Sequence, residues 1–427
     1  MIPILSRLGI RDYMRLLICF VILFIESVVR SFLNLIPFNA GWKRLSRRMM
    51  NPVLKFVRTK KRKMSTYHVI EYNDPDTPTM IKQSRGFECE EHLVVTEDGY
   101  ILVLHRIVPA VKKKAGKPVL FMHGFMMNSE VWVCHPGENQ SLAFELASRG
   151  YDVWLGNSRG NKYSCKHVKM KPCNEDFWDY ALDELAIMDV PAIVDYILDI
   201  VPYNSLSYVG FSQGTAQCFA SLSINPHLNK KINCFVALAA VTRPSGLENK
   251  FVKSLIKITP KLVFLLFGRK NLISSVIWWK QILGRDLYST CIDKSMNILF
   301  GWNTNCIAKE HKPILYSHLY SYGSVKQVVH WFQIYQYQEF QMYDENEEFF
   351  ASGHQIPKFP LQNIEVPIHL FHGLSDTLSD IAYTLSSCPT NTKVYSIENY
   401  EHLDFLWASD VGSQVNKSVI KIIEKLP

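Results

Sequence analysis

The chain lacks the patterns that mark several common classes of binding protein and metalloprotein. Its ten cysteines include no C-x-x-C pair. Their scatter is typical of reduced, mostly buried thiols, and one or two disulfides remain as an alternative. No zinc-finger or RNP-like pattern indicates nucleic acid, and no metal-ligand constellation stands out. With 427 residues, 48% of them hydrophobic, the chain is long and apolar enough for one large domain or a core with an insertion.

Acidic residues are scarce near the N-terminus, where basic residues gather. Residues 1–64 hold 14 of the 47 Lys and Arg but only two of the 39 Asp and Glu. The net charge of +8 is therefore an N-terminal property, and the rest of the chain is mildly acidic. A basic arm on such a body favours an anionic lipid surface as its partner rather than nucleic acid.

The basic arm also contains an apolar stretch. Leu16–Ile25 is an unbroken run of ten apolar residues, and the apolar character continues past Glu26 and Arg30. A membrane-spanning helix needs about 20 such residues. A cleaved signal peptide fits less well because no small-residue cleavage site follows, and a buried core helix is the other alternative. We expect residues 1–40 to form a membrane-anchor helix and residues 41–65 a basic linker.

The positions of Lys and Arg orient this anchor. Three precede the apolar run and ten lie in residues 43–63, so the positive-inside rule places the body of the chain in the cytosol. Basic flanks on both sides also fit a monotopic insertion into one leaflet or a lipid-droplet surface. The expected location is a membrane of the endoplasmic reticulum, a lipid droplet or the plasma membrane.

Short apolar runs alternate with helical patterns from about residue 66 onward. Glu90–Val108 contains two β-rich runs around Glu97-Asp98-Gly99, which predicts a hairpin. Asp176–Asp199 has helical periodicity. Strands alternating with helices predict a mostly parallel sheet. Further strands are expected within Lys117–Phe125, Ser205–Val209, Asn233–Val241, Val366–Asp376 and Thr392–Phe405.

The alternation breaks between residues 242 and 360. That stretch is rich in aromatic residues and shows no series of strands, which predicts a helical cap or lid insertion. The core is then expected in two parts, residues 66–241 and residues 361–427. Aromatic residues of the insertion either pack as core or line an apolar tunnel. They include Trp278, Trp279, Trp302, Trp331 and Phe332.

A G-x-S-x-G pentapeptide, residues 210–214, lies between a predicted strand and a predicted helix. The pentapeptide alone is weak evidence because glycine and serine are common. At the junction of a strand and a helix, however, it is the arrangement of a nucleophile elbow. The glycines allow close chain approach, and the helix N-terminus supplies N–H groups and a positive dipole end. Ser212 is therefore predicted to be a nucleophile.

A nucleophilic serine needs a base and an acid. In folds with this elbow the partners follow in the order Ser, Asp or Glu, His. Asp376 follows one predicted strand, and His402 follows another, 26 residues later. We predict that His402 takes the proton of Ser212 and that Asp376 orients the imidazole and stabilises its charge. The backbone N–H groups of Phe125 and Gln213 are the predicted oxyanion hole.

Other histidines and aspartates near these motifs are rivals for the two roles. His123 is expected to hold its loop by hydrogen bonding, but it is also an alternative base. Asp404 lies close to His402, on the wrong side for the usual geometry. The remaining alternatives are His369 and His372 as base and Asp380 as acid.

Together, several segments resemble the acid lipase family of α/β-hydrolases over roughly residues 66–425. The matching segments are "HGFMMNSEVWV", "GYDVWLGNSRGNKYS", "FWDYALDELAIMDVPA", "YVGFSQGTA", "HWFQIYQYQEFQMYD", "HGLSDTLSD" and "EHLDF". The N-terminal apolar segment and "NSEVWV…GNSRGNKYS" are most similar to fungal steryl ester hydrolases of that family. The resemblance implies the α/β-hydrolase fold, a cap over the site and long-chain acyl esters as substrates, steryl esters first. It also implies the roles already given to Ser212, Asp376 and His402.

The leading prediction is a membrane- or lipid-droplet-associated serine hydrolase that cleaves steryl esters to sterol and fatty acid. It would act through an acyl-enzyme and need no cofactor. A triacylglycerol lipase would use the same triad, and acyl transfer to an alcohol would use the same intermediate. A non-catalytic, anchored lipid-binding protein is the alternative outside enzymes. Secreted and lysosomal members carry signal peptides, so this chain's uncleaved-looking anchor weighs against a lumenal location.

Overall fold

The computed structural model describes the C-terminal body of the chain. The expected anchor, residues 1–40, and the linker, residues 41–65, lie outside the described residues. Within the described part, no helix is both long enough and apolar enough to cross a bilayer. The described residues run from 74 to 426, except for 85, 110–115, 138, most of 248–258, 273 and 346–354.

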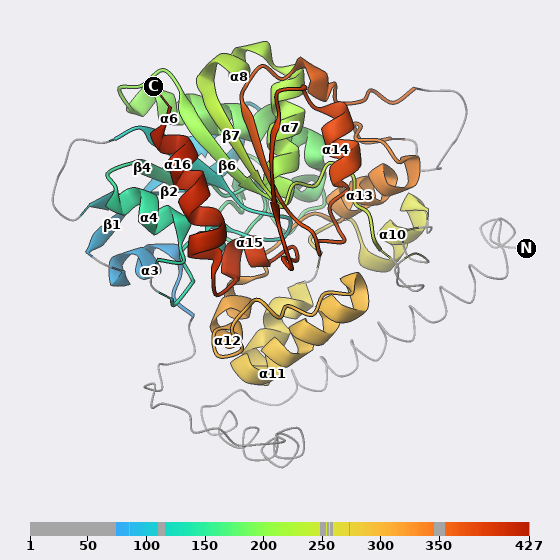
Figure 1. Cartoon of the computed structure of the whole chain (residues 1–427). Helices are drawn as coiled ribbons and strands as arrows, with labels where there is room; N and C mark the ends of the chain where they lie inside the picture. The colour runs from blue at the N-terminus through green and yellow to red at the C-terminus, as the bar shows by residue number, and fades with distance from the viewer. Residues whose placement is uncertain are drawn as a thin grey trace, which may run out of the picture. The chain divides into compact units, whose positions relative to one another are not determined.

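A nine-stranded sheet forms the centre of the described part (Figure 1). The strand order is β1-β2-β4-β3-β6-β7-β8-β9, and β5 pairs with β2. All pairs from β4 to β9 are parallel, whereas the pairs made by β2 are antiparallel. The predicted α/β class with a mostly parallel sheet is thus confirmed. The strands are β1 (Phe87–Val95), β2 (Tyr100–Pro109), β3 (Pro118–Met122), β4 (Asp152–Leu155), β5 (Lys166–His167), β6 (Leu206–Phe211), β7 (Ile232–Leu238), β8 (Ile368–Gly373) and β9 (Lys393–Ile397).

The expected hairpin is formed by β1 and β2. Their register runs from Phe87 opposite Pro109 to Val95 opposite Ile101. Gly99 closes the turn with a φ of 97° and donates its N–H to the carbonyl of Thr96 at 2.9 Å. A residue with a Cβ is strained at that φ, so glycine suits the position.

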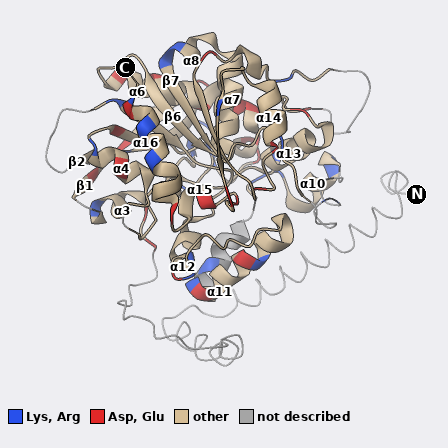
Figure 2. Cartoon of the chain, in the orientation of Figure 1, with Lys and Arg blue, Asp and Glu red and all other residues tan. Residues whose placement is uncertain are grey.

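Alternate residues of the strands pack into two cores on opposite faces of the sheet. On β3, Val119 and Phe121 join the core that includes α4 and α16, while Leu120 and Met122 join the core that includes α6 and α7. The central strands β6 and β7 carry no charged residue, and charge of both signs lies on outer helices such as α11 (Ser274–Phe300) and α16 (Lys417–Glu424) (Figure 2). The helices packed around the sheet are α3 (Thr77–Gln83), η2 (Ser129–Trp132), α4 (Leu142–Ser148), α6 (Val190–Ile200), α7 (Gln213–Ile224), α8 (Pro226–Lys231), η6 (Leu361–Asn363), α14 (Ile381–Ser387), α15 (Asp404–Trp407), η7 (Gly412–Asn416) and α16 (Lys417–Glu424).

Within the expected helix over Asp176–Asp199, a first short turn is separate from one continuous helix that runs from residue 182 to residue 200. The short turn is η3 (Asp176–Trp178), and the continuous helix consists of α5 (Leu182–Glu184), the π-helical segment η4 (Leu185–Asp189) and α6. Pro191 explains the π-helical turn before α6, because proline has no N–H for the helical ladder and its ring crowds the preceding turn. The structure confirms the predicted helix, but helical periodicity does not reveal a π-helical segment of this kind.

Residues 242–360, between β7 and β8, are built from helices in the part that the structure describes. These are α10 (Pro260–Phe267), α11 (Ser274–Phe300), α12 (Lys312–Leu315), η5 (Tyr316–His318) and α13 (Val325–Tyr337) (Figure 1). Gly284 interrupts α11 with a φ of 72°. The carboxyl ends of the parallel strands meet at one edge of the sheet, which is where ligands usually bind in such folds.

Candidate active site

Ser212 occupies a sharp turn between β6 and α7. Its φ of 52° and ψ of −120° are unfavourable for a residue with a side chain. The turn is held because the Ser212 N–H donates to the carbonyl of Leu238 on β7 at 3.1 Å. The Thr215 hydroxyl donates to the Ser212 carbonyl at 2.6 Å. This strained strand-to-helix junction is the backbone of a nucleophile elbow.

Steric contacts explain why positions 210 and 214 of the pentapeptide are glycines. A Cβ on Gly210 would lie 2.7 Å from the carbonyl oxygen of Gly214, and a Cβ on Gly214 would collide with the carbonyl oxygen of Met122 on β3. Neither contact is tolerable between an sp³ carbon and a backbone oxygen. The elbow can therefore close against β3 only with glycine at both positions.

The structure brings Ser212, His402 and Asp376 into one hydrogen-bonded chain. The Nε2 atom of His402 lies 2.8 Å from Ser212 Oγ, and its Nδ1 atom lies 2.8 Å from Asp376 Oδ2. All three residues are buried, at 9%, 3% and 8% exposure respectively. They follow β6, β9 and β8, so the parallel sheet places them at the same edge. This is the geometry in which a histidine can take a serine proton while a carboxylate orients its ring.

The rival histidines have other partners. His123 is buried behind the site, where its Nδ1 donates to the Gly124 carbonyl at 2.8 Å and its Nε2 accepts from the Ser158 N–H at 3.2 Å. Burial lowers the pKa of His123 to about 4, so it serves its loop as a neutral ring. His369 and His372 contact strand β9 instead, through Tyr395 and Ser396.

The rival aspartates are also engaged elsewhere. Asp380 pairs with the guanidinium of Arg243 and caps α14 by accepting from the Tyr383 N–H at 3.0 Å. Asp404 accepts from the Glu401 N–H at 2.7 Å. Burial raises the pKa of Asp404 to about 7, which makes it a poor partner for a cationic imidazole.

The two predicted oxyanion donors follow two paired strands. Gln213 is the first residue of α7, directly after Ser212, and Phe125 follows β3. Strands β3 and β6 are paired, with Met122 opposite Gly210, so both residues lie at the same edge of the sheet. The loop after β3 is held by the insertion, because the Ser321 N–H donates to the Met126 carbonyl at 2.6 Å.

Several contacts between the insertion and the site were not foreseen. The indole N–H of Trp331 donates to the Gln213 side-chain oxygen at 2.9 Å. The Glu401 carboxylate, next to His402, accepts from the N–H groups of Asn303 and Thr304 at 2.7–3.0 Å. The partners in these contacts are about 100 residues apart in the sequence, and no local sequence pattern predicts such pairs. Within the described residues, no group of three or more His, Cys, Asp or Glu is placed to hold a metal ion.

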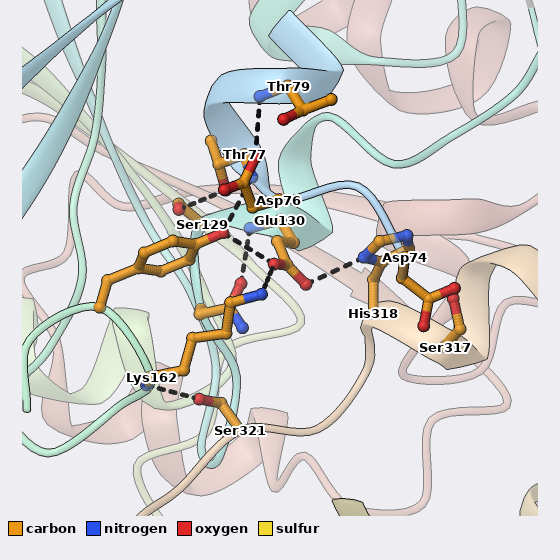
Figure 3. A network of polar contacts seen from close by, with 12 residues as sticks. Asp74, Asp76, Thr77, Thr79, Ser129, Glu130, Lys162, Ser317, His318 and Ser321 are labelled. Carbon is orange, nitrogen blue, oxygen red and sulfur yellow. Dashed lines mark hydrogen bonds and ion pairs between the residues drawn. The ribbon is translucent and has the colours of Figure 1, made fainter. Parts of the chain in front are cut away.

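A buried polar network is centred on the segment that follows β3 (Figure 3). Its centre is Glu130 of η2, which is 3% exposed. The Glu130 carboxylate pairs with the Lys162 ammonium, accepts from the Tyr163 hydroxyl at 2.7 Å and lies 2.9 Å from His318 Nδ1. His318 belongs to η5, so the network also ties this loop to the insertion.

The charges of this network determine the ionisation of Glu130. Burial alone would raise the pKa of Glu130, but the hydrogen bond and charge of His318 and the charge of Lys162 outweigh it and lower the pKa to about 2. A carboxylate with a lowered pKa in the folded state stabilises the protein above its unfolded pKa. That contribution is lost as the pH falls from about 4.3 toward 2.

Glu130→Gln is expected to lower the free energy of unfolding by roughly 2 kcal/mol at neutral pH, because it removes charge-assisted hydrogen bonds from a buried site. The difference from wild type should shrink as the pH falls below about 4. Chemical unfolding curves at several pH values measure both effects. Glu88→Gln, on the exposed edge of β1, is the matched control. A difference independent of pH would mean that the Glu130 charge does not stabilise the fold.

Comparisons with known proteins agree with this fold. Residues 117–409 match the family described as "alpha/beta hydrolase fold", and residues 77–136 match the "Partial alpha/beta-hydrolase lipase region". A "Probable lipase" of Schizosaccharomyces pombe is 39% identical, over 97% of this chain and 94% of the relative. A crystal structure of a Sulfolobus solfataricus protein has a TM-score of 0.57 at 16% identity, over 80% of this chain and 95% of that chain, which shows the fold alone.

Two animal relatives have more specific names. Human "Gastric triacylglycerol lipase" is 34% identical over 80% of this chain and 89% of the relative. Rat "Lysosomal acid lipase/cholesteryl ester hydrolase" is 34% identical over 78% of this chain and 88% of the relative. The relatives, the fold and the matches to the two family models lead to one conclusion. The chain belongs to the acid lipase family of α/β-hydrolases and is a carboxylic ester hydrolase.

Proposed function

We propose that the enzyme cleaves steryl esters to sterol and fatty acid, with Ser212 as nucleophile, His402 as base and Asp376 as the acid that orients it. The observation that carries this proposal is the chain of two 2.8 Å hydrogen bonds from Ser212 through His402 to Asp376. A serine hydroxyl in such a chain loses its proton to the imidazole as it attacks an ester carbonyl.

The proposed reaction has two steps. In the first, Ser212 Oγ attacks the ester carbonyl, His402 takes the hydroxyl proton, and the resulting oxyanion is stabilised by the N–H groups of Phe125 and Gln213. His402 then donates the proton to the sterol oxygen as the C–O bond breaks. In the second step, His402 deprotonates a water molecule, which attacks the acyl carbonyl. His402 then returns this proton to Ser212 Oγ as the bond between Oγ and the acyl carbon breaks and the fatty acid leaves.

Two observations support a lipid ester as substrate. One relative carries the name "Lysosomal acid lipase/cholesteryl ester hydrolase", and the insertion places aromatic residues, including Trp302 and Trp331, against the site. Triacylglycerols are the second candidate substrate, because a relative of equal identity is named "Gastric triacylglycerol lipase". The same triad serves both esters.

We also propose that the enzyme works at a membrane or lipid-droplet surface, with its catalytic domain in the cytosol. The apolar run at Leu16–Ile25 and the basic flanks on both sides of it support this location. Co-flotation of the full chain with vesicles of phosphatidylserine and phosphatidylcholine measures the association. A full chain that stays at the bottom of the gradient would contradict it.

The substrate is tested by measuring fatty acid release from cholesteryl oleate and from triolein in detergent micelles. We expect kcat/KM to be at least about tenfold higher for cholesteryl oleate, which corresponds to about 1.4 kcal/mol of preferential transition-state binding. The same lipid preparations with the Ser212→Ala variant give the background rate. Faster cleavage of triolein would leave the chemistry intact and make triacylglycerol the substrate class.

A further inference from the structure

The imidazole ring of His402 is covered on its flat face by an aromatic side chain from the insertion. Trp302 stacks on it with ring centroids 5.3 Å apart and planes inclined by only 14°. Both residues are 3% exposed. Phe211, the residue before the nucleophile, also packs against the imidazole, at 5.1 Å and a tilt of 49°.

This stacking restricts a motion that the hydrogen bonds leave free. The bonds to Ser212 and Asp376 lie in the plane of the imidazole and fix its rotation within that plane. They resist tilting out of the plane only weakly, because hydrogen-bond strength falls slowly near the optimal angle. A parallel ring against the face blocks that tilt by direct contact. Hydrogen bonds and stacking together define the orientation of the His402 ring.

Trp302 is itself held by the loop that carries the acid. Its indole N–H donates to the Thr377 hydroxyl at 3.1 Å, and Thr377 directly follows Asp376. The Thr377 hydroxyl in turn donates to the Phe300 carbonyl at 2.9 Å, and the Phe300 ring stacks on Trp302 at 4.4 Å. Trp302 therefore joins the face of the base to the Thr377 hydroxyl beside the acid.

The loop around Trp302 is also anchored beside the base. Gly301 turns the chain with a φ of 75°, a conformation that suits glycine. The two N–H groups that follow Trp302, those of Asn303 and Thr304, donate to the carboxylate of Glu401. Glu401 immediately precedes His402. One short loop of the insertion is thus hydrogen-bonded both to the residue after Asp376 and to the residue before His402.

We propose that Trp302 is the positioning residue for His402: it holds the imidazole in line with Ser212 and stabilises the imidazolium during the reaction. This inference rests on the proposed function, in which His402 is the base. When His402 takes the serine proton, the positive charge forms on a ring that is stacked against the indole with centroids 5.3 Å apart. The face of an indole attracts a cation, and more strongly when water is excluded.

A positioning role for Trp302 has different kinetic consequences from a role in which the side chain only contacts the lipid. A positioning residue lowers kcat for every substrate when it is removed, because the base serves every substrate. A residue that only lines an acyl tunnel raises KM for long-chain esters and leaves short esters unaffected. The two roles therefore predict different results with p-nitrophenyl acetate and p-nitrophenyl palmitate.

The test compares Trp302→Leu, Trp302→Phe and Thr377→Val with wild type on both p-nitrophenyl esters. Trp302→Leu is expected to lower kcat about tenfold on both esters with KM within about twofold, since the cation–aromatic attraction is lost. Trp302→Phe retains an aromatic face and should recover kcat to within about threefold of wild type. Thr377→Val keeps the side-chain shape but removes the anchor of the indole, and kcat should fall about threefold.

Trp178→Leu is the matched control for loss of a buried tryptophan. Trp178 is 2% exposed and donates to the Pro172 carbonyl at 2.8 Å, within the core that contains α6 and α7. It should lose stability, measured as Tm, without the kcat loss of Trp302→Leu. Equal losses of kcat in the two variants would overturn the inference. A rise in KM confined to palmitate would overturn it as well, because Trp302 would then serve the acyl chain.

His402→Ala distinguishes failure of this inference from failure of the proposed function. If His402→Ala keeps wild-type kcat, then His402 is not the base and the proposed function fails. If His402→Ala loses activity but Trp302→Leu does not, only the role of Trp302 fails. The double variant Trp302→Leu/His402→Ala should be no slower than His402→Ala alone, because Trp302 acts through His402. A further tenfold loss of kcat in the double variant would show that Trp302 does not act through His402.

Discussion

Ser212→Ala is expected to lower kcat for ester hydrolysis by roughly 10⁴- to 10⁶-fold, because Ser212 forms the acyl-enzyme in the proposed reaction. The Ser212 side chain is small and stands in a turn whose backbone is held by Leu238 and Thr215. The substitution should therefore leave the Tm nearly unchanged. Initial rates with a p-nitrophenyl ester and a thermal unfolding curve measure the two quantities.

A fluorophosphonate probe gives an independent readout of the same prediction. Wild type should react covalently at Ser212, whereas Ser212→Ala should remain unlabelled. Ser223→Ala is the matched control, since Ser223 is also buried on α7 but donates only to the Ala220 carbonyl at 2.8 Å. Labelling and hydrolysis that survive in Ser212→Ala would leave the G-x-S-x-G pentapeptide as an ordinary turn. They would also move the reaction to another residue.

The second large effect concerns a buried cation in the loop after β4. The guanidinium of Arg159 is fully buried and contacts the equally buried carboxylate of Asp189 in η4 at 2.7 and 2.8 Å. It also contacts Asp98 of the β1–β2 turn at 3.1 Å, and it lies 4.1 Å from the ring centre of Tyr100. Arg159 thus joins the hairpin, the β4 loop and the η4–α6 region.

Arg159→Met is expected to lower the free energy of unfolding by about 3–5 kcal/mol, because it leaves the Asp189 carboxylate buried without its partner. Burial already raises the pKa of Asp189 above its ordinary value despite Arg159. A carboxyl group whose folded pKa is raised costs stability above its unfolded pKa, and protonation relieves that cost. The variant should therefore recover stability relative to wild type as the pH falls toward 4.

Denaturant unfolding at pH 7 and pH 4.5 measures this prediction. The double variant Arg159→Met/Asp189→Leu separates the uncompensated charge from the loss of packing. Replacing a buried ion pair by apolar side chains is often close to neutral, so the double variant should be clearly more stable than Arg159→Met. A double variant as unstable as the single variant would show that packing of the Arg159 side chain, rather than charge, holds this region.

Local patterns were sufficient for the features that repeat along the chain. The hairpin of β1 and β2 and the buried strands β3, β6 and β7 follow from apolar runs and turn residues, and the structure confirms them. The π-helical segment before Pro191 was not predicted, because helical periodicity continues through such short irregularities. The expected anchor at residues 1–40 stays a prediction, since it lies outside the described residues.

The sequence by itself determined the α/β class, the acid lipase family and the positions of Ser212, Asp376 and His402 at strand ends. Parallel strands bring their carboxyl ends to one edge of a sheet, so residues distant in sequence can be grouped without coordinates. Only the tertiary structure decided which side chains touch. It placed Trp302 on His402, His318 on Glu130 and Arg159 on Asp189. These contacts depend on how helices and loops pack, and packing between distant segments has no period in the sequence.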